Sequence, residues 1–121
     1  MRELLFKGKR KDTGEWTEGY FFKIWDRVFL LWGMTGDSPN MEEVIPETVG
    51  QYTGLNDKNG KKIFEGDIVK CCRDNDILKI DFVRAYFFAT NDDWWDFIDE
   101  LGEIEVIGNI HDNSELLEVK E

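Results

Sequence analysis

The chain has 121 residues, a formal net charge of −11 and 41 % hydrophobic residues, including nine Phe, five Trp and three Tyr. This length and apolar content are typical of one small folded domain with its own core, and they exclude a disordered chain. No apolar run reaches the roughly 18 residues of a membrane-spanning helix, and the first residues lack the apolar stretch of a signal peptide. We therefore expect a soluble protein of the cytoplasm.

Charge is distributed unevenly along the chain. Residues 91–121 contain eleven Asp or Glu and one base, Lys120, whereas residues 1–11 contain five bases and one acid. The acidity of the whole chain disfavours binding to nucleic acids or anionic membranes, because their phosphates would be repelled. A local basic face at the beginning of the chain stays compatible with this pattern.

The first half of the chain contains short segments with alternating apolar residues, which predict β-strands. The Lys11–Gly14 segment has turn chemistry and is expected to join the first two strands as a hairpin. Residues 33–40 contain Gly33, Gly36 and Pro39 and are predicted to form a loop. The strands expected before residue 53 are 3–7, 15–22, 26–32 and a weak strand over 44–52 that Pro46 interrupts.

The second half continues this pattern. Asp57-Lys58-Asn59-Gly60 is the sharpest local signal, since Asn-Gly favours a type I′ hairpin turn. Around and after this turn, strands are expected over residues 51–55, 62–64, 68–71, 77–83, 85–89 and 103–110.

One helix is predicted, over residues 91–101. Asn91 can cap its first turn, and Gly102 can end it. The apolar residues of this segment have helical spacing: Trp94, Trp95, Phe97, Ile98 and Leu101.

Many short strands and one helix predict a mainly β fold, a small antiparallel barrel or curled sheet. We expect a single domain over residues 1–121, with an N-terminal β-hairpin region (1–50), a barrel-like core (51–112) and an acidic tail (113–121).

The sequence contains few candidates for catalytic residues. His111 is the only histidine, and no nucleophile motif surrounds Ser38 or Ser114, the only serines. We expect no catalytic residue, no cofactor and no metal site, so the protein is not expected to be an enzyme. The adjacent Cys71 and Cys72 are interpreted as reduced thiols, with a vicinal disulfide or a metal pair as alternatives.

Two groups of residues are candidates for binding. Aromatic side chains are enriched at the centres of protein interfaces, which makes a partner-binding role a hypothesis for Phe21, Trp25, Trp32, Trp94 and Trp95. Carboxylates of the predicted helix form an expected acidic face: Asp92, Asp93, Asp96 and Asp99. A solvated helix surface is the simpler interpretation of these four, and binding of a hard cation is the alternative.

Three segments of the chain resemble a known family. They are 6–16, with Phe6-Lys7-Gly8-Lys9-Arg10; 45–69, which contains the Asp57–Gly60 turn and Glu65-Gly66-Asp67; and 105–117, with Gly108-Asn109-Ile110-His111-Asp112. Together they resemble the YopX family of phage and prophage proteins. The resemblance implies an SH3-type barrel with added elements and oligomeric assembly, and it brings no catalytic residues.

These observations favour a non-enzymatic phage or prophage accessory protein that acts by protein binding, most simply as a homo-oligomer. One alternative is an acidic inhibitor that mimics DNA toward a basic host protein. The other is a nucleic-acid-binding small barrel that uses the following bases: Lys7, Lys9, Arg10, Lys11, Lys58, Lys61 and Lys62.

Overall fold

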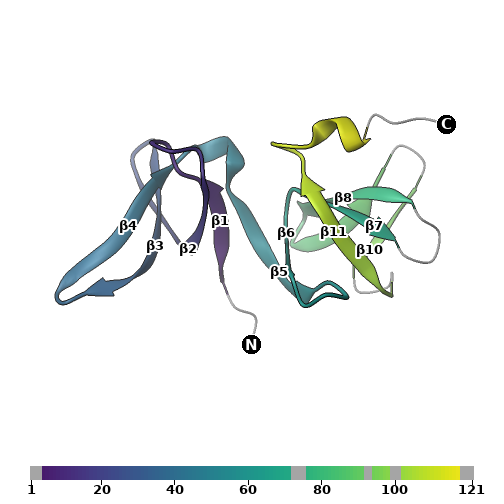
Figure 1. The fold of residues 1–121 in the computed structure, drawn as a ribbon, viewed down its shortest axis with the longest axis horizontal. Coiled ribbons are helices and arrows are strands. Elements are labelled where there is room, and N and C mark those ends of the chain that lie inside the picture. The colour runs from purple at the N-terminus through teal and green to yellow at the C-terminus, as the bar shows by residue number, and fades with distance from the viewer. Residues whose placement is uncertain (1–3, 72–75, 92–93, 99–101, 118–121) are drawn as a thin grey trace. The chain divides into compact units, whose positions relative to one another are not determined.

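The computed structural model describes residues 4–71, 76–91, 94–98 and 102–117 of the chain. The described residues form a mainly β structure whose contacts separate into two compact units, an N-terminal unit (1–52) and a C-terminal unit (53–121). Figure 1 shows the strands of both units. No helix formed by the described residues has the length and apolar character needed to cross a membrane.

The N-terminal unit is an antiparallel sheet with the strand order β4-β3-β2-β1-β5. The last of these strands continues past residue 52, where it pairs with β6. The elements are β1 (Phe6–Lys9), β2 (Trp16–Ile24), β3 (Arg27–Thr35), β4 (Ser38–Val44), the 3₁₀ turn η1 (Pro46–Thr48) and β5 (Gly50–Asn56).

The core of this unit is small. Alternate side chains of β3 and the end of β4 supply its buried residues, Val28, Leu30 and Val44, and Phe6 and Val49 pack against them. Thr48 fixes η1 beside this core, since its hydroxyl accepts the amide of Lys9 at 2.9 Å and donates to the carbonyl of Ile45 at 2.6 Å.

The end of β4 is tied to the residues that follow β1. Arg10 and Val44 form an isolated antiparallel bridge, the amide of Lys11 donates to the carbonyl of Glu43, and the amide of Ile45 donates to the carbonyl of Lys9. Neither sheet formed by the described residues closes on itself, so the SH3-type barrel, whose core was expected over residues 51–112, is not confirmed. The mainly β class is confirmed.

The loop predicted over residues 33–40 is wrong. β3 extends to Thr35 and β4 begins at Ser38, so Gly36 and Asp37 form the whole connection. Pro39 lies within β4, opposite Met34, and β4 is an edge strand, where the missing amide of a proline is tolerated.

The C-terminal unit contains a five-stranded antiparallel sheet with the order β10-β9-β8-β7-β11. Its core is larger, because one face of β7, β8 and β9 is continuously apolar. The elements are β6 (Lys62–Phe64), β7 (Asp67–Cys71), β8 (Ile77–Val83), β9 (Tyr86–Thr90), β10 (Trp95–Phe97), β11 (Ile104–Asn109) and η3 (Ser114–Leu117). The buried core consists of Ile63, Val69, Cys71, Leu78, Ile80, Phe87, Ala89, Ile98 and Ile104.

The helix predicted over residues 91–101 is wrong for the part that the structure describes, because residues 95–97 form β10, the edge strand beside β9. Asn91 closes this connection. Its amide donates to the carbonyl of Trp94 at 3.1 Å, and its side-chain oxygen accepts the amide of Trp94 at 3.1 Å. The apolar spacing that suggests a helix also fits a strand, in which Trp95 and Phe97 share one face.

Asp57 organises the turn before β6. Its carboxylate accepts the amides of Asn59 and Lys61, both at 2.9 Å, and the amide of Val106 in β11, also at 2.9 Å. Gly60 adopts a φ of +85°, and Asn59 is not left-handed, so the turn is a type I turn with a glycine bulge and not the predicted type I′ turn. Burial acts to raise the pKa of Asp57, but the three amides outweigh it and lower the pKa below its ordinary value.

A second turn follows β11. The side-chain oxygen of Asn109 accepts the amides of His111 and Asp112, both at 3.0 Å. The amide of Asn109 in turn donates to the side-chain oxygen of Asn113 at 3.2 Å. Gly108 is required here, because a Cβ atom at this position would lie 2.6 Å from Oδ1 of Asn113. The motifs behind the family resemblance therefore shape turns of the fold.

Candidate protein-binding surfaces

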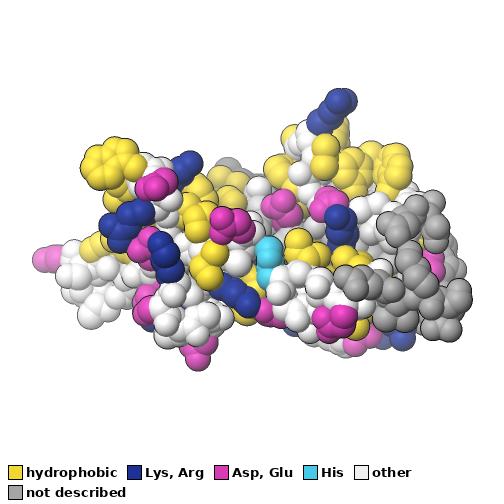
Figure 2. Space-filling view, turned by 90° about the horizontal axis from the view of Figure 1, so that it is seen from above, with side chains coloured by type: hydrophobic (Ala, Val, Ile, Leu, Met, Phe, Trp, Pro, Cys, Tyr) yellow, Lys and Arg dark blue, Asp and Glu magenta, His cyan; other side chains and the backbone are white. Residues whose placement is uncertain are grey.

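One side of the N-terminal sheet is apolar and exposed. Tyr20, Phe22 and Ile24 alternate along β2, and in the neighbouring strands Leu31 and Met41 continue the row of Tyr20, while Phe29 lies opposite Phe22. All but Phe29 and Leu31, which are half-buried, are exposed. Figure 2 shows hydrophobic side chains at the surface of these strands among charged ones. We call this surface the N-terminal apolar face: Tyr20, Phe22, Ile24, Phe29, Leu31 and Met41.

Trp25 lies at the end of this face, in the two-residue turn between β2 and β3. Its side chain is 89 % exposed, and its φ of 54° is left-handed. Of the two turn residues only Trp25 has a positive φ, a backbone conformation in which glycine is preferred. A non-glycine residue held in this conformation costs on the order of 1 kcal/mol, and such strain is concentrated at functional sites.

Ion pairs border the apolar face. Arg27 binds Glu43 through two nitrogens, at 2.8 and 3.2 Å, and Lys11 lies 3.2 Å from the same carboxylate. The hydrogen bonds from Arg27, followed by those from Lys11, lower the pKa of Glu43 to about 2. The guanidinium of Arg27 also lies 5.2 Å from the ring centre of Phe29, so the border and the apolar face are in contact.

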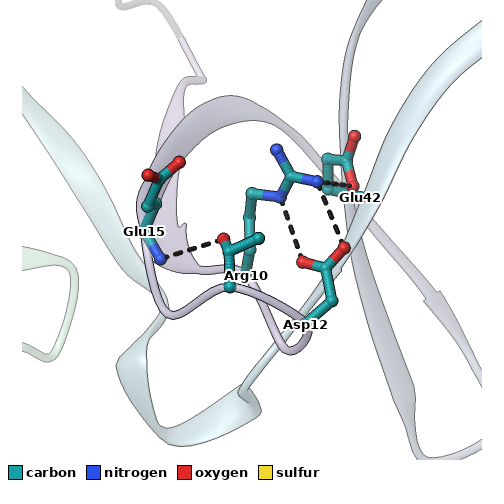
Figure 3. Close-up of polar contacts among 5 residues, drawn as sticks. Arg10, Asp12, Glu15 and Glu42 are labelled. Atoms are coloured by element: carbon teal, nitrogen blue, oxygen red, sulfur yellow. Dashed lines mark hydrogen bonds and ion pairs between the residues drawn. The ribbon is translucent and has the colours of Figure 1, made fainter.

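The basic residues at the beginning of the chain are engaged within the protein. Figure 3 shows Arg10 between Asp12 and Glu42, with distances of 3.2 Å to both oxygens of Asp12 and 3.1 Å to Glu42. The hydrogen bond with Arg10 lowers the pKa of Asp12. Lys7 and Lys9 lie over the ring of Trp16, at 4.9 and 5.7 Å from its centre. Contacts with phosphates would have to compete with these partners.

The C-terminal unit has a second exposed apolar surface. Tyr86 and Phe88 of β9 share a sheet face with Trp95 and Phe97 of β10, and Phe88 is the direct partner of Phe97. The ring centre of Phe88 lies 5.1 Å from that of Trp95 and 5.3 Å from that of Phe97. The ring centre of Tyr86 lies 5.6 Å from that of Phe97. We call these four residues the aromatic cluster. Tyr86 is 60 % and Trp95 58 % exposed.

The five aromatic residues predicted as binding candidates do not form one site. Phe21 lies on the face of β2 opposite to Tyr20 and Phe22, and its ring packs 5.4 Å from that of Phe6. Trp32 is 52 % exposed at a bulge between β3 and β4.

Trp94 and Trp95, although adjacent, differ in surroundings. Trp94 is half-buried against the C-terminal core, and its indole nitrogen donates to Asp76 at 2.9 Å, so it has a structural role. Trp95 belongs to the aromatic cluster.

Three members of the predicted acidic face, Asp92, Asp93 and Asp99, lie outside the described residues. The fourth, Asp96, is in β10, where its carboxylate accepts the amide of Phe97 at 2.8 Å. Phe97 and the other cluster members Tyr86 and Phe88, like the apolar face around Tyr20 and Phe22, were not singled out from sequence. The alternation of apolar residues in β2 is the signal that could have indicated the N-terminal apolar face.

No arrangement for catalysis is visible in the described part of the chain. His111 is exposed in the turn after β11, and among the described residues no three His, Cys, Asp or Glu side chains are placed to hold one metal ion. Cys71 is a buried reduced thiol of the C-terminal core, whereas Cys72 lies outside the described residues.

Comparisons with known proteins identify relatives of the chain. The model of the YopX protein family matches residues 6–118. Among solved structures, the crystal structure of protein EF1440 from Enterococcus faecalis is similar, with a TM-score of 0.63, 26 % sequence identity, and coverage of 97 % of this chain and 99 % of that chain. The comparison with curated proteins gives no match. Because the family model spans nearly the whole sequence, the chain belongs to the YopX family.

Proposed function

We propose that this protein is a non-enzymatic accessory protein of a phage or prophage, that it works in the host cytoplasm, and that it assembles with a second copy of itself through the N-terminal apolar face. The observation that carries the proposal is Trp25, which is almost fully exposed and held in a conformation that favours glycine. Exposure of a tryptophan and a left-handed φ both oppose stability in the isolated chain. Burial of this side chain in an interface offsets both costs.

The size of the apolar surface supports this reading. Single exposed apolar residues are ordinary in soluble proteins, but contiguous rows along neighbouring strands mark interaction surfaces. Here Tyr20, Leu31 and Met41 form one row across three strands, and Phe22 and Phe29 form the next. The ring centres of Phe22 and Phe29 lie 6.3 Å apart, so these two side chains form an aromatic pair across β2 and β3.

Charge favours a second copy as the occupant. Residues 1–52 contain nine acids and seven bases, a net charge of −2, whereas residues 53–121 contain seventeen acids and eight bases, a net charge of −9. Two copies of the N-terminal face therefore meet with little repulsion. The border of the face carries both signs, through Arg27 and Glu43, which suits a symmetric interface in which the same patch faces itself.

Sedimentation velocity over a concentration series up to the millimolar range tests the proposal. The wild-type protein should form dimers, and a Tyr20→Ser/Phe22→Ser variant should shift to monomers with a Kd at least about tenfold weaker, since buried aromatic anchors dominate interface energies. The matched control is Tyr86→Ser/Trp95→Ser, which removes exposed rings from the C-terminal unit and should dimerise like the wild type. A wild-type chain that stays monomeric throughout the series would refute self-assembly.

A further inference from the structure

The aromatic cluster of the C-terminal unit takes no part in the proposed assembly. Its rings lie on the face of β9 and β10 opposite to the buried core residues Phe87 and Ala89. Phe88 and Phe97 stack with a 27° angle between their planes, and Trp95 meets both edge-on. Contacts among the rings hold the cluster in one arrangement, while Trp95 and Tyr86 keep more than half of their surfaces exposed.

Negative charge is concentrated in the part of the sequence that contains this cluster. Residues 76–103, which contain β8, β9 and β10, hold eight acids against two bases, Lys79 and Arg84, a net charge of −6. Asp81 lies directly opposite Phe88 on the neighbouring strand, and Lys79 is 3.8 Å from its carboxylate, at a partly exposed position. A unit with this excess of acids attracts cations over distance and repels a second copy of itself.

Aromatic faces in an acidic setting are suited to one side chain above others. Ring faces attract cations, and arginine in particular both stacks on aromatic planes and pairs with carboxylates. A nucleic acid would be repelled by the same charge, and a purely apolar partner would make no use of it. Charge complementarity therefore indicates a basic polypeptide as the occupant.

We propose that the aromatic cluster binds an arginine-bearing segment of a partner protein, with guanidinium groups stacked on Trp95 and Tyr86 and within reach of Asp81. The segment is recognised through its side chains. Pairing along the free edge of β10 is disfavoured, since the amide of Phe97 already donates to the carboxylate of Asp96. This proposal goes beyond self-assembly and does not depend on it, because its residues belong to the other unit.

Isothermal titration with an oligoarginine peptide as the probe tests the inference. The wild type should bind, and Trp95→Ala and Tyr86→Ser should each weaken the binding by about tenfold. Trp95→Phe should restore most of the affinity, and Asp81→Asn should weaken it less than the loss of a ring. An oligolysine peptide of the same length should bind more weakly, because an ammonium group lacks a plane to stack.

The control variants separate ring recognition from general attraction. Trp32→Ala removes an exposed tryptophan from the N-terminal unit and should bind the peptide like the wild type, as should the Tyr20→Ser/Phe22→Ser variant. Two results would overturn the inference: absence of peptide binding at low salt, or equal binding by the wild type, Trp95→Ala and Tyr86→Ser. Circular dichroism of Tyr86→Ser, whose ring lies at the edge of the cluster, checks that the loss of binding occurs in a folded chain.

Discussion

The two units of the chain bury their apolar residues to different degrees. The C-terminal unit encloses a core of nine buried residues, eight of them from five strands and the ninth, Ile98, from the residue after β10, and its aromatic cluster lies outside that core on the opposite sheet face. The N-terminal unit buries a cluster of three residues, Val28, Leu30 and Val44, while a larger apolar set on β2, β3 and β4 stays exposed. One unit is therefore stabilised mainly by its own interior, whereas the other keeps apolar surface exposed, which we propose serves binding to a second copy.

The charges differ in the same way. The N-terminal unit is close to neutral, and its exposed residues Arg27 and Lys11 form ion pairs with the half-buried Glu43. The C-terminal unit carries most of the negative charge of the chain. A nearly neutral apolar face suits self-association, whereas an acidic surface with exposed rings suits a basic partner.

The largest effect is expected at Asp57, which joins the turn before β6 to β11. Asp57→Ala leaves the amides of Asn59, Lys61 and Val106 without their acceptor, and should lower the free energy of unfolding by about 3 kcal/mol. Asp57→Asn keeps one acceptor oxygen and should fall between the wild type and Asp57→Ala. Urea denaturation followed by circular dichroism measures both, and a change below about 1 kcal/mol for Asp57→Ala would contradict this role.

A smaller effect of opposite sign is expected in the turn between β8 and β9. Ala85 has a φ of 70° and Arg84 a φ of 52°, both left-handed. Ala85→Gly relieves this strain but adds entropy to the unfolded chain, so the net stabilisation should be about 0.5–1 kcal/mol. Ala89→Gly is the matched control: Ala89 is buried in β9 without a positive φ, and its replacement should destabilise the protein. Urea denaturation of both variants checks the opposite signs.

The smallest effect concerns acid stability of the N-terminal unit. The pKa of Glu43 is lowered in the folded protein from 4.5 to about 2, mainly by Arg27. Its contribution to stability is therefore fully present above pH 4.5 and is lost as the pH falls toward about 2. Glu43→Gln should flatten the fall of Tm across this window, and Arg27→Gln should do the same. Variants that lose Tm as steeply as the wild type would show that the ion pair does not act in this way.

Most strands follow from the sequence because alternation is a local signal. The segments around Phe22, Ile80 and Ile104 combine alternating apolar residues with flanking turn residues, and the structure has strands there. The helix predicted over residues 91–101 is wrong where the structure describes β10, since short apolar runs such as Trp94-Trp95-Asp96-Phe97 fit both the helical and the strand period and only pairing with β9 decides between them. The loop predicted around Pro39 is wrong for a similar reason, because a strand tolerates proline where it lies at the edge of a sheet, as β4 does, and the sequence alone does not show this position.

The candidate surfaces were less accessible to sequence reasoning for a physical reason. Alternation shows that a strand has two faces, but it does not say which face another element covers. Phe21 and Phe22 are adjacent and chemically identical, yet only Phe22 lies on the apolar face. The strain at Trp25 depends on the turn type, which the pair Trp25-Asp26 does not specify.

We propose that exposed apolar residues of the N-terminal unit serve association at a cost to the stability of the single chain. Trp25→Gly tests it most directly, because glycine suits the left-handed turn and lacks the exposed indole. Urea denaturation at low concentration and sedimentation velocity at high concentration, on the same variant, measure the two sides. Relative to the wild type, the Trp25→Gly monomer should be more stable by about 1 kcal/mol, and its dimer should have a Kd at least about tenfold weaker. A variant that dimerises as tightly as the wild type would contradict it.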